Sequence, residues 1–213
     1  MLTKTRSLVA VAAFALVSAA VPALAGPPLI CHPFETRGGA LLPWDATGAR
    51  TNWNAPLASY DTARLTDDVV KLLDSDALVL TRMENLRRAT IYAQKDPAVA
   101  RQLLDAVMVR AKSARTVGAQ ASFDAGYLIE SYKQATHIRE KKSETAWAAV
   151  DETLKIDGYG LVKKAMATVG TTNAEMEFAA SLMTQGSVSR DHRARASANA
   201  ANDSALAVNL ARY

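Results

Sequence analysis

The chain has 213 residues, of which 49% are hydrophobic, and it carries a formal net charge of +4 with a single cysteine. This apolar content argues against a wholly disordered chain, and one cysteine excludes an intramolecular disulfide framework and a CxxC redox or zinc site. The length fits one domain with a real core or a short helical array, but not two large domains.

The first 25 residues have the pattern of a secretory signal. Lys4 and Arg6 place positive charge before an apolar stretch over residues 8–21, which is too short for a comfortable transmembrane helix. Ala23-Leu24-Ala25 supplies small side chains at positions −3 and −1 of a cleavage site, and Gly26 follows. We therefore expect an exported mature chain, periplasmic or extracellular, that begins at Gly26 and has no membrane-spanning segment.

Charge and motifs narrow the expected partners. Cleavage would remove two basic residues and no acidic ones, which leaves 23 basic and 21 acidic residues and a net charge of +2 (23 − 21). Such a small excess gives little support for nucleic-acid binding, so we expect a protein or peptide partner in the cell envelope and no nucleic acid. The sequence has no G-x-S-x-G, H-E-x-x-H or EF-hand motif, and we expect no cofactor.

Residues 26–60, here named the arm, differ in composition from the rest of the chain. The arm has five of the seven prolines, which oppose helix and central strand. It also carries large apolar side chains, namely Leu29, Ile30, Phe34, Leu41, Leu42, Trp44, Trp53, Leu57 and Tyr60. Burying each of these stabilises by roughly 1.5–3 kcal/mol. We therefore expect an irregular arm that packs on the rest of the protein, with Trp44 and Trp53 against the helices.

From Asp61 onward the apolar spacing is helical, and no segment alternates convincingly at period two. Asp61, Asp96-Pro97 and Gly170 have the residue types that begin or end helices. We expect helices over about residues 62–74, 77–94, 97–115, 119–138, 144–156, 158–169 and 173–185. This gives a helical domain over residues 61–186, followed by a helical tail over residues 187–213 whose thin apolar face predicts weak packing.

Successive helical hairpins form either a short α-solenoid or a compact bundle. Residues 86–111, with Ala89, Tyr92, Ala100 and Leu104, resemble one tetratricopeptide-type hairpin. The chain also resembles a group of small, uncharacterised secreted bacterial proteins, in residues 27–35 (PPLICHPFE), 82–89, 123–128, 157–159 and 175–180. The resemblance implies a common all-α architecture and carries no activity or catalytic residue across.

One candidate site lies in the arm. Cys31, His32 and Glu35 combine a thiol, an imidazole and a carboxylate, which together ligate soft or borderline metals. Pro33 opposes the helix that would align His32 with Glu35. The alternative is that Cys31 is packed as a small hydrophobe, as free cysteine commonly is.

The other candidate lies in the second expected helix, where Arg82, Arg87 and Arg88 surround Glu84, and Glu84 and Arg88 are spaced i, i+4. One interpretation is a solvated charge network on the helix surface, and the other is a surface that binds an anionic partner. Two functions follow. The favoured one is an exported non-catalytic helical interaction or scaffold protein. The alternative is a metal- or redox-active exported protein, an enzyme included, that uses Cys31 and His32.

Overall fold

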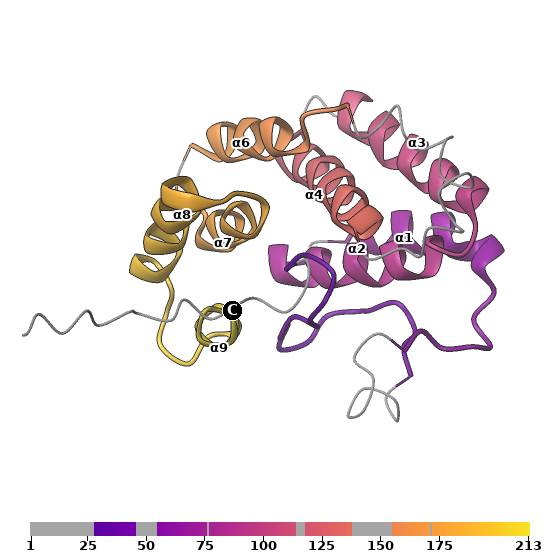
Figure 1. Ribbon diagram of the computed structural model, residues 1–213, viewed down its shortest axis with the longest axis horizontal. Coiled ribbons are helices and arrows are strands. Elements are labelled where there is room, and N and C mark those ends of the chain that lie inside the picture. Colours follow the sequence, from indigo (N-terminus) through magenta and orange to yellow (C-terminus); the bar gives the residue numbers. More distant parts are fainter. Residues whose placement is uncertain (1–27, 46–54, 76, 114–117, 138–154, 171) are drawn as a thin grey trace, which may run out of the picture.

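The computed structural model describes residues 28–45, 55–75, 77–113, 118–137, 155–170 and 172–213 (Figure 1). These residues form helices and connecting segments and no strand, so the all-α prediction is confirmed. The helices are η2 (Thr62–Arg64), α1 (Leu65–Leu73), α2 (Val79–Ala93), α3 (Pro97–Ser113), α4 (Gly118–His137), α6 (Gly158–Val169), α7 (Ala174–Met183), α8 (Gly186–Ala198) and α9 (Ala205–Arg212). Across the described ranges, no helix combines the length and the apolar character needed to cross a bilayer.

Local capping chemistry sets several helix boundaries where the sequence predicted them. The Asp61 carboxylate accepts a hydrogen bond from the Ala63 amide at 3.0 Å, and the Asp96 carboxylate accepts one from the Ala98 amide at 2.9 Å. Gly170 ends α6 with a φ of 71°, the left-handed conformation that favours glycine. The expected helix over 144–156 lies almost entirely outside the described residues, as do Trp53 and the expected cleavage site after Ala25.

Helix α4 is the centre of the core. Residues 121–129 are all buried, and α4 contacts α2, α3, α6 and α7. Its crossing with α6 requires glycine on both sides. A Cβ on Gly126 would lie 2.4 Å from the carbonyl oxygen of Gly158, and a Cβ on Gly158 would lie 2.7 Å from that of Gly126. The two backbones therefore touch, and a side chain at either position would force the helices apart.

The arm runs without regular structure along α2 and lies beside α9 at its other end (Figure 1). Leu29, Ile30, Phe34 and Leu42 are at most 5% exposed and belong to the hydrophobic core. Trp44 is half-buried, with its ring 5.6 Å from that of Tyr92 in an edge-on arrangement. The prediction that Trp44 packs on the helices is therefore confirmed.

The tail is better packed than its apolar pattern predicts. Leu206 and Asn209 of α9 are buried, and the Asn209 side-chain amide bonds to both backbone groups of Glu35, at 3.0 Å from its N–H and 2.8 Å from its carbonyl. The expectation of weak packing is wrong for α9. Its attachment depends on polar contacts with the arm, which apolar periodicity does not detect.

Candidate functional site: the groove that binds the arm

Helix α2 supplies the floor of a groove that contains the arm. Fourteen of its fifteen residues are buried, including Arg82, Glu84, Asn85 and Arg87. A helix buried on every side normally carries apolar residues alone, because a buried charge is costly unless it is paired and hydrogen-bonded. These polar side chains therefore require partners inside the protein.

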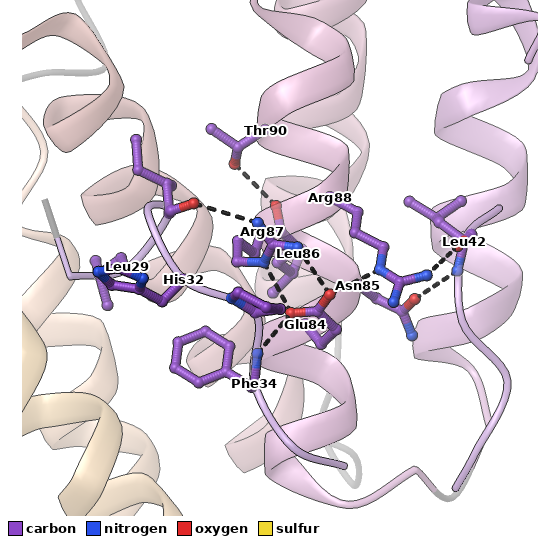
Figure 2. Close-up of polar contacts among 12 residues, drawn as sticks. Leu29, His32, Phe34, Leu42, Glu84, Asn85, Leu86, Arg87, Arg88 and Thr90 are labelled. Atoms are coloured by element: carbon purple, nitrogen blue, oxygen red, sulfur yellow. Dashed lines mark hydrogen bonds and ion pairs between the residues drawn. The ribbon is translucent and has the colours of Figure 1, made fainter. Parts of the chain in front are cut away.

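Glu84 is the centre of the floor, between Arg87 and Arg88 (Figure 2). Its Oε2 lies 2.8 Å from Nε of Arg87, and its Oε1 lies 2.9 Å from Nη2 of Arg87 and 2.7 Å from Nε of Arg88. The predicted i, i+4 pair of Glu84 and Arg88 is therefore present. The side chains of Glu84 and Arg87 are both 0% exposed, so this is a buried bidentate ion pair with charge-assisted hydrogen bonds.

The same three charged residues bind the backbone of the arm. The Phe34 amide donates to Oε2 of Glu84 at 3.0 Å (Figure 2). Arg87 Nη1 donates to the carbonyl of Ile30 at 3.3 Å, and Arg88 Nη1 donates to that of Leu42 at 2.6 Å. The ion pairs thus also satisfy main-chain groups that an irregular buried segment cannot satisfy by itself.

Asn85 binds the part of the arm beyond its bend. Its Oδ1 accepts from the Leu42 amide at 2.9 Å and its Nδ2 donates to the Ala40 carbonyl at 3.0 Å (Figure 2). Trp44 then covers this end of the floor, with the guanidinium carbons of Arg87 and Arg88 at 5.1 and 5.4 Å from its ring centroid. Both distances are typical of cation–π contacts.

Helix α4 and the end of the chain form the other walls. The Leu29 amide donates to Oε1 of Gln134 at 2.8 Å, and the Tyr127 hydroxyl donates to the Leu29 carbonyl at 3.2 Å. On the α9 side, Arg212 donates to the Pro33 carbonyl at 3.0 Å and Tyr213 donates to the His32 carbonyl at 2.7 Å. We name the groove by its lining side chains: Glu84, Asn85, Arg87, Arg88, Tyr127, Gln134, Asn209, Arg212 and Tyr213.

The groove binds an extended segment through its main chain. The contacts above join side chains of the groove to backbone amides and carbonyls of the arm, while the apolar side chains Leu29, Ile30 and Phe34 fill the core. Backbone contacts of this kind give affinity with little dependence on the bound sequence, and apolar pockets add selectivity. The arrangement is that of a peptide-binding groove occupied by the chain's own arm.

Burial corrects the expected solvated helix surface. Arg82, Glu84 and Arg87 are at most 1% exposed, so the interpretation as an exposed charge network is wrong for these three, and none of them offers a free surface to a partner. Arg88 is half-buried. The cause is the arm and the neighbouring helices, which cover faces of α2 that local sequence assigns to solvent.

Arg82 belongs to a separate buried cluster that joins α1, α2 and α4. It donates to Oδ2 of Asp124 at 2.7 Å and to the carbonyl of Leu73, the last residue of α1, at 2.9 Å. Arg110 of α3 also lies near Asp124, at 3.4 Å. Burial raises the pKa of Asp124 to about 6, although both arginines act to lower it.

Asp124 should make stability depend on pH. Its pKa is about 6 in the folded state against a reference value of 3.8, so the folded protein binds this proton more tightly than the unfolded chain. The resulting contribution, roughly 3 kcal/mol, is complete below about pH 4 and is lost as pH rises through about 6. Carbon NMR of the Asp124 carboxyl should titrate near pH 6, and the free energy of unfolding of Asp124→Asn should lack this component. A titration midpoint below pH 4 would contradict the prediction.

The structure does not bring the proposed metal ligands of the arm together. Cys31 is buried, while His32 and Glu35 are half-buried; His32 places its ring edge-on to Tyr213 at 5.7 Å, and the Glu35 carboxylate accepts from the Arg37 amide at 3.0 Å. Among the described residues, no group of three or more His, Cys, Asp or Glu side chains is arranged to bind a metal. Burial raises the pKa of the Cys31 thiol, against the opposing charge of Arg87, and burial lowers the pKa of His32.

Cys31 should therefore react slowly in the folded protein. A thiol that is buried and has a raised pKa contains little reactive thiolate. Because it is the only cysteine, labelling of the whole chain by a maleimide reports on this position alone. We expect the native protein to label at least about 100-fold more slowly than the chain in denaturant. Rapid stoichiometric labelling of the native protein would instead restore the hypothesis of a reactive thiol.

A further polar cluster joins the last helices and was not predicted from the sequence. His192 of α8 is buried, with Nε2 2.6 Å from the Tyr159 hydroxyl and Nδ1 2.5 Å from Oε2 of Glu177. Arg195 lies 3.0 Å from the other oxygen of Glu177. Burial alone would raise the pKa of Glu177, but hydrogen bonds from Arg195 and His192 lower it. In the sequence, His192 and Arg195 appear only as a basic patch, because their partners lie on α6 and α7.

Comparison with known proteins adds no family or fold relative. The chain matches no protein-family model, no curated protein and no solved structure. Its function must therefore be inferred from its own residues and their geometry.

Proposed function

We propose that the protein is an exported, non-catalytic helical module that binds another protein or peptide in the cell envelope. The observation that carries the proposal is the groove, whose buried charges bind an extended backbone. Glu84 accepts an amide at 3.0 Å, and Arg88 donates to a carbonyl at 2.6 Å. Export rests on the signal-like residues 1–25, and the location is periplasmic or extracellular.

The same proposal includes a repeat-like helical architecture. Helices adjacent in the chain pack on each other, as α3 does on α4 and α7 on α8, which supports hairpin units. Contacts between α2 and α7, which are distant in the chain, favour a compact bundle over a solenoid, because solenoid repeats contact only their neighbours. We therefore propose tetratricopeptide-like hairpins arranged as a bundle.

Site-specific photo-crosslinking in envelope extract tests the proposal. Arg37 lies on the exposed bend of the arm and Arg101 is exposed on α3, so a photo-reactive residue at each position samples a different surface. We expect the mature chain to capture one defined envelope protein from position 37 and not from position 101. Absence of specific capture from the arm, together with stoichiometric metal in the purified protein, would favour the alternative metal- or redox-active function.

A further inference from the structure

The arm bends sharply at three residues. Arg37, Gly38 and Gly39 have φ angles of 48°, 115° and 92°, and all three are exposed. Glycine adopts positive φ readily, but Arg37 does so at a cost because its Cβ crowds the backbone. The bend divides the arm into a limb over residues 28–36, here named the N-limb, and a second part that begins at Ala40.

The part of the groove that binds the N-limb keeps its charge pairs without it. Glu84 is bound by both Arg87 and Arg88 at 2.7–2.9 Å, whether or not its oxygen also accepts the Phe34 amide. The floor is therefore aligned before the N-limb binds, which lowers the cost of binding. An N-limb from another molecule would make the same backbone contacts and bury the same Leu29, Ile30 and Phe34 side chains.

We propose that the N-limb exchanges between two copies of this chain, so that each limb fills the groove of the other copy and residues 37–39 are the hinge. A short hinge under strain favours this kind of exchange, because opening it releases the left-handed residue while every other contact is kept. The partner is a second copy because the N-limb is the segment shown to fit the groove. This inference goes beyond the proposed function and does not depend on export or on an envelope partner.

Substitutions in the hinge test the proposal through the oligomeric state. A Cβ on Gly38 meets nothing within 4 Å, so Gly38→Ala adds backbone strain at φ 115° without a clash. We expect it to raise the dimerisation constant at least about tenfold in sedimentation equilibrium, and Arg37→Gly to lower that constant about tenfold. The matched control is Gly170→Ala, also at positive φ in open space, which should reduce stability and leave the dimerisation constant unchanged.

Isotope-mixed crosslinking identifies the exchanged segment. Equal amounts of unlabelled and nitrogen-15 chains, each with a photo-reactive phenylalanine analogue in place of His32, are equilibrated and irradiated. Because His32 lies beside Tyr213, exchange predicts crosslinks from the N-limb to the end of the chain that combine both isotopes in the dimer fraction. Dimers with same-isotope crosslinks only, including dimers formed through exposed Leu78 or Val109, would overturn the proposal, as would a monomeric Gly38→Ala variant.

Discussion

Glu84→Ala should lower the free energy of unfolding by about 3–5 kcal/mol, because it leaves the buried Arg87 charge without a carboxylate partner. Arg87 is 0% exposed and bonds to both oxygens of Glu84. The substitution also removes the acceptor of the Phe34 amide. For a chain of this size the loss corresponds to a fall in Tm on the order of 10 °C. Urea and thermal unfolding measure both quantities.

The matched control is Asp105→Ala, which breaks an exposed ion pair with Arg101. Its two side chains are 46% and 58% exposed, so its removal should cost no more than about 1 kcal/mol. The double variant Glu84→Leu, Arg87→Met should recover part of the loss, since it removes both charges. Recovery should be incomplete because the Phe34 amide and the Ile30 carbonyl remain without their partners. A Glu84→Ala variant as stable as Asp105→Ala would contradict the importance of this pair.

Helix boundaries were predictable because they depend on neighbouring residues. The Asp61 and Asp96 caps and the left-handed Gly170 act within a few residues of themselves, so the sequence contains the whole interaction. The environment of Arg82, Glu84 and Arg87 was not predictable in this way. Their contacts reach Asp124, Phe34 and Ile30, which lie 42, 50 and 57 residues away in the chain.

One signal in the sequence does point toward the groove. A proline-containing arm with large apolar side chains must be partly buried, yet it has no regular structure in which to pair its own amides and carbonyls. Side chains elsewhere must then bind that backbone, and arginines, an asparagine and a glutamate among the apolar residues of the second expected helix are suitable donors and acceptors. The combination predicts buried polar residues on that helix, although it does not identify their individual partners.

The tail was misjudged for a related reason. Asn209 is buried, and it pairs with Glu35 at a separation of 174 residues. Apolar periodicity counts an asparagine as a solvent-facing residue, although here its amide bonds to a backbone as a neighbouring strand would. Docking of α9 on the arm therefore couples the two described ends of the fold.

Phe34→Ala tests that coupling and should be the most damaging substitution at an apolar position of the arm. The Phe34 ring is 5% exposed, stacks on Tyr213 at a centroid distance of 5.3 Å and meets Phe178 edge-on at 6.1 Å. Truncating such a ring removes its buried area and leaves a cavity, at a cost of about 3–5 kcal/mol. Chemical unfolding should show this loss.

Hydrogen exchange separates the local effect from the global one. Because Phe34 joins the arm to the end of the chain, Phe34→Ala should reduce amide protection in α9 more than in α3, at conditions where the protein remains folded. Phe123→Ala provides the matched control, since Phe123 is equally buried but lies in α4 beside Tyr127. It should cost a similar free energy without a selective effect on α9. Equal protection of α9 in both variants would mean that this helix is stabilised by α7 and α8 alone.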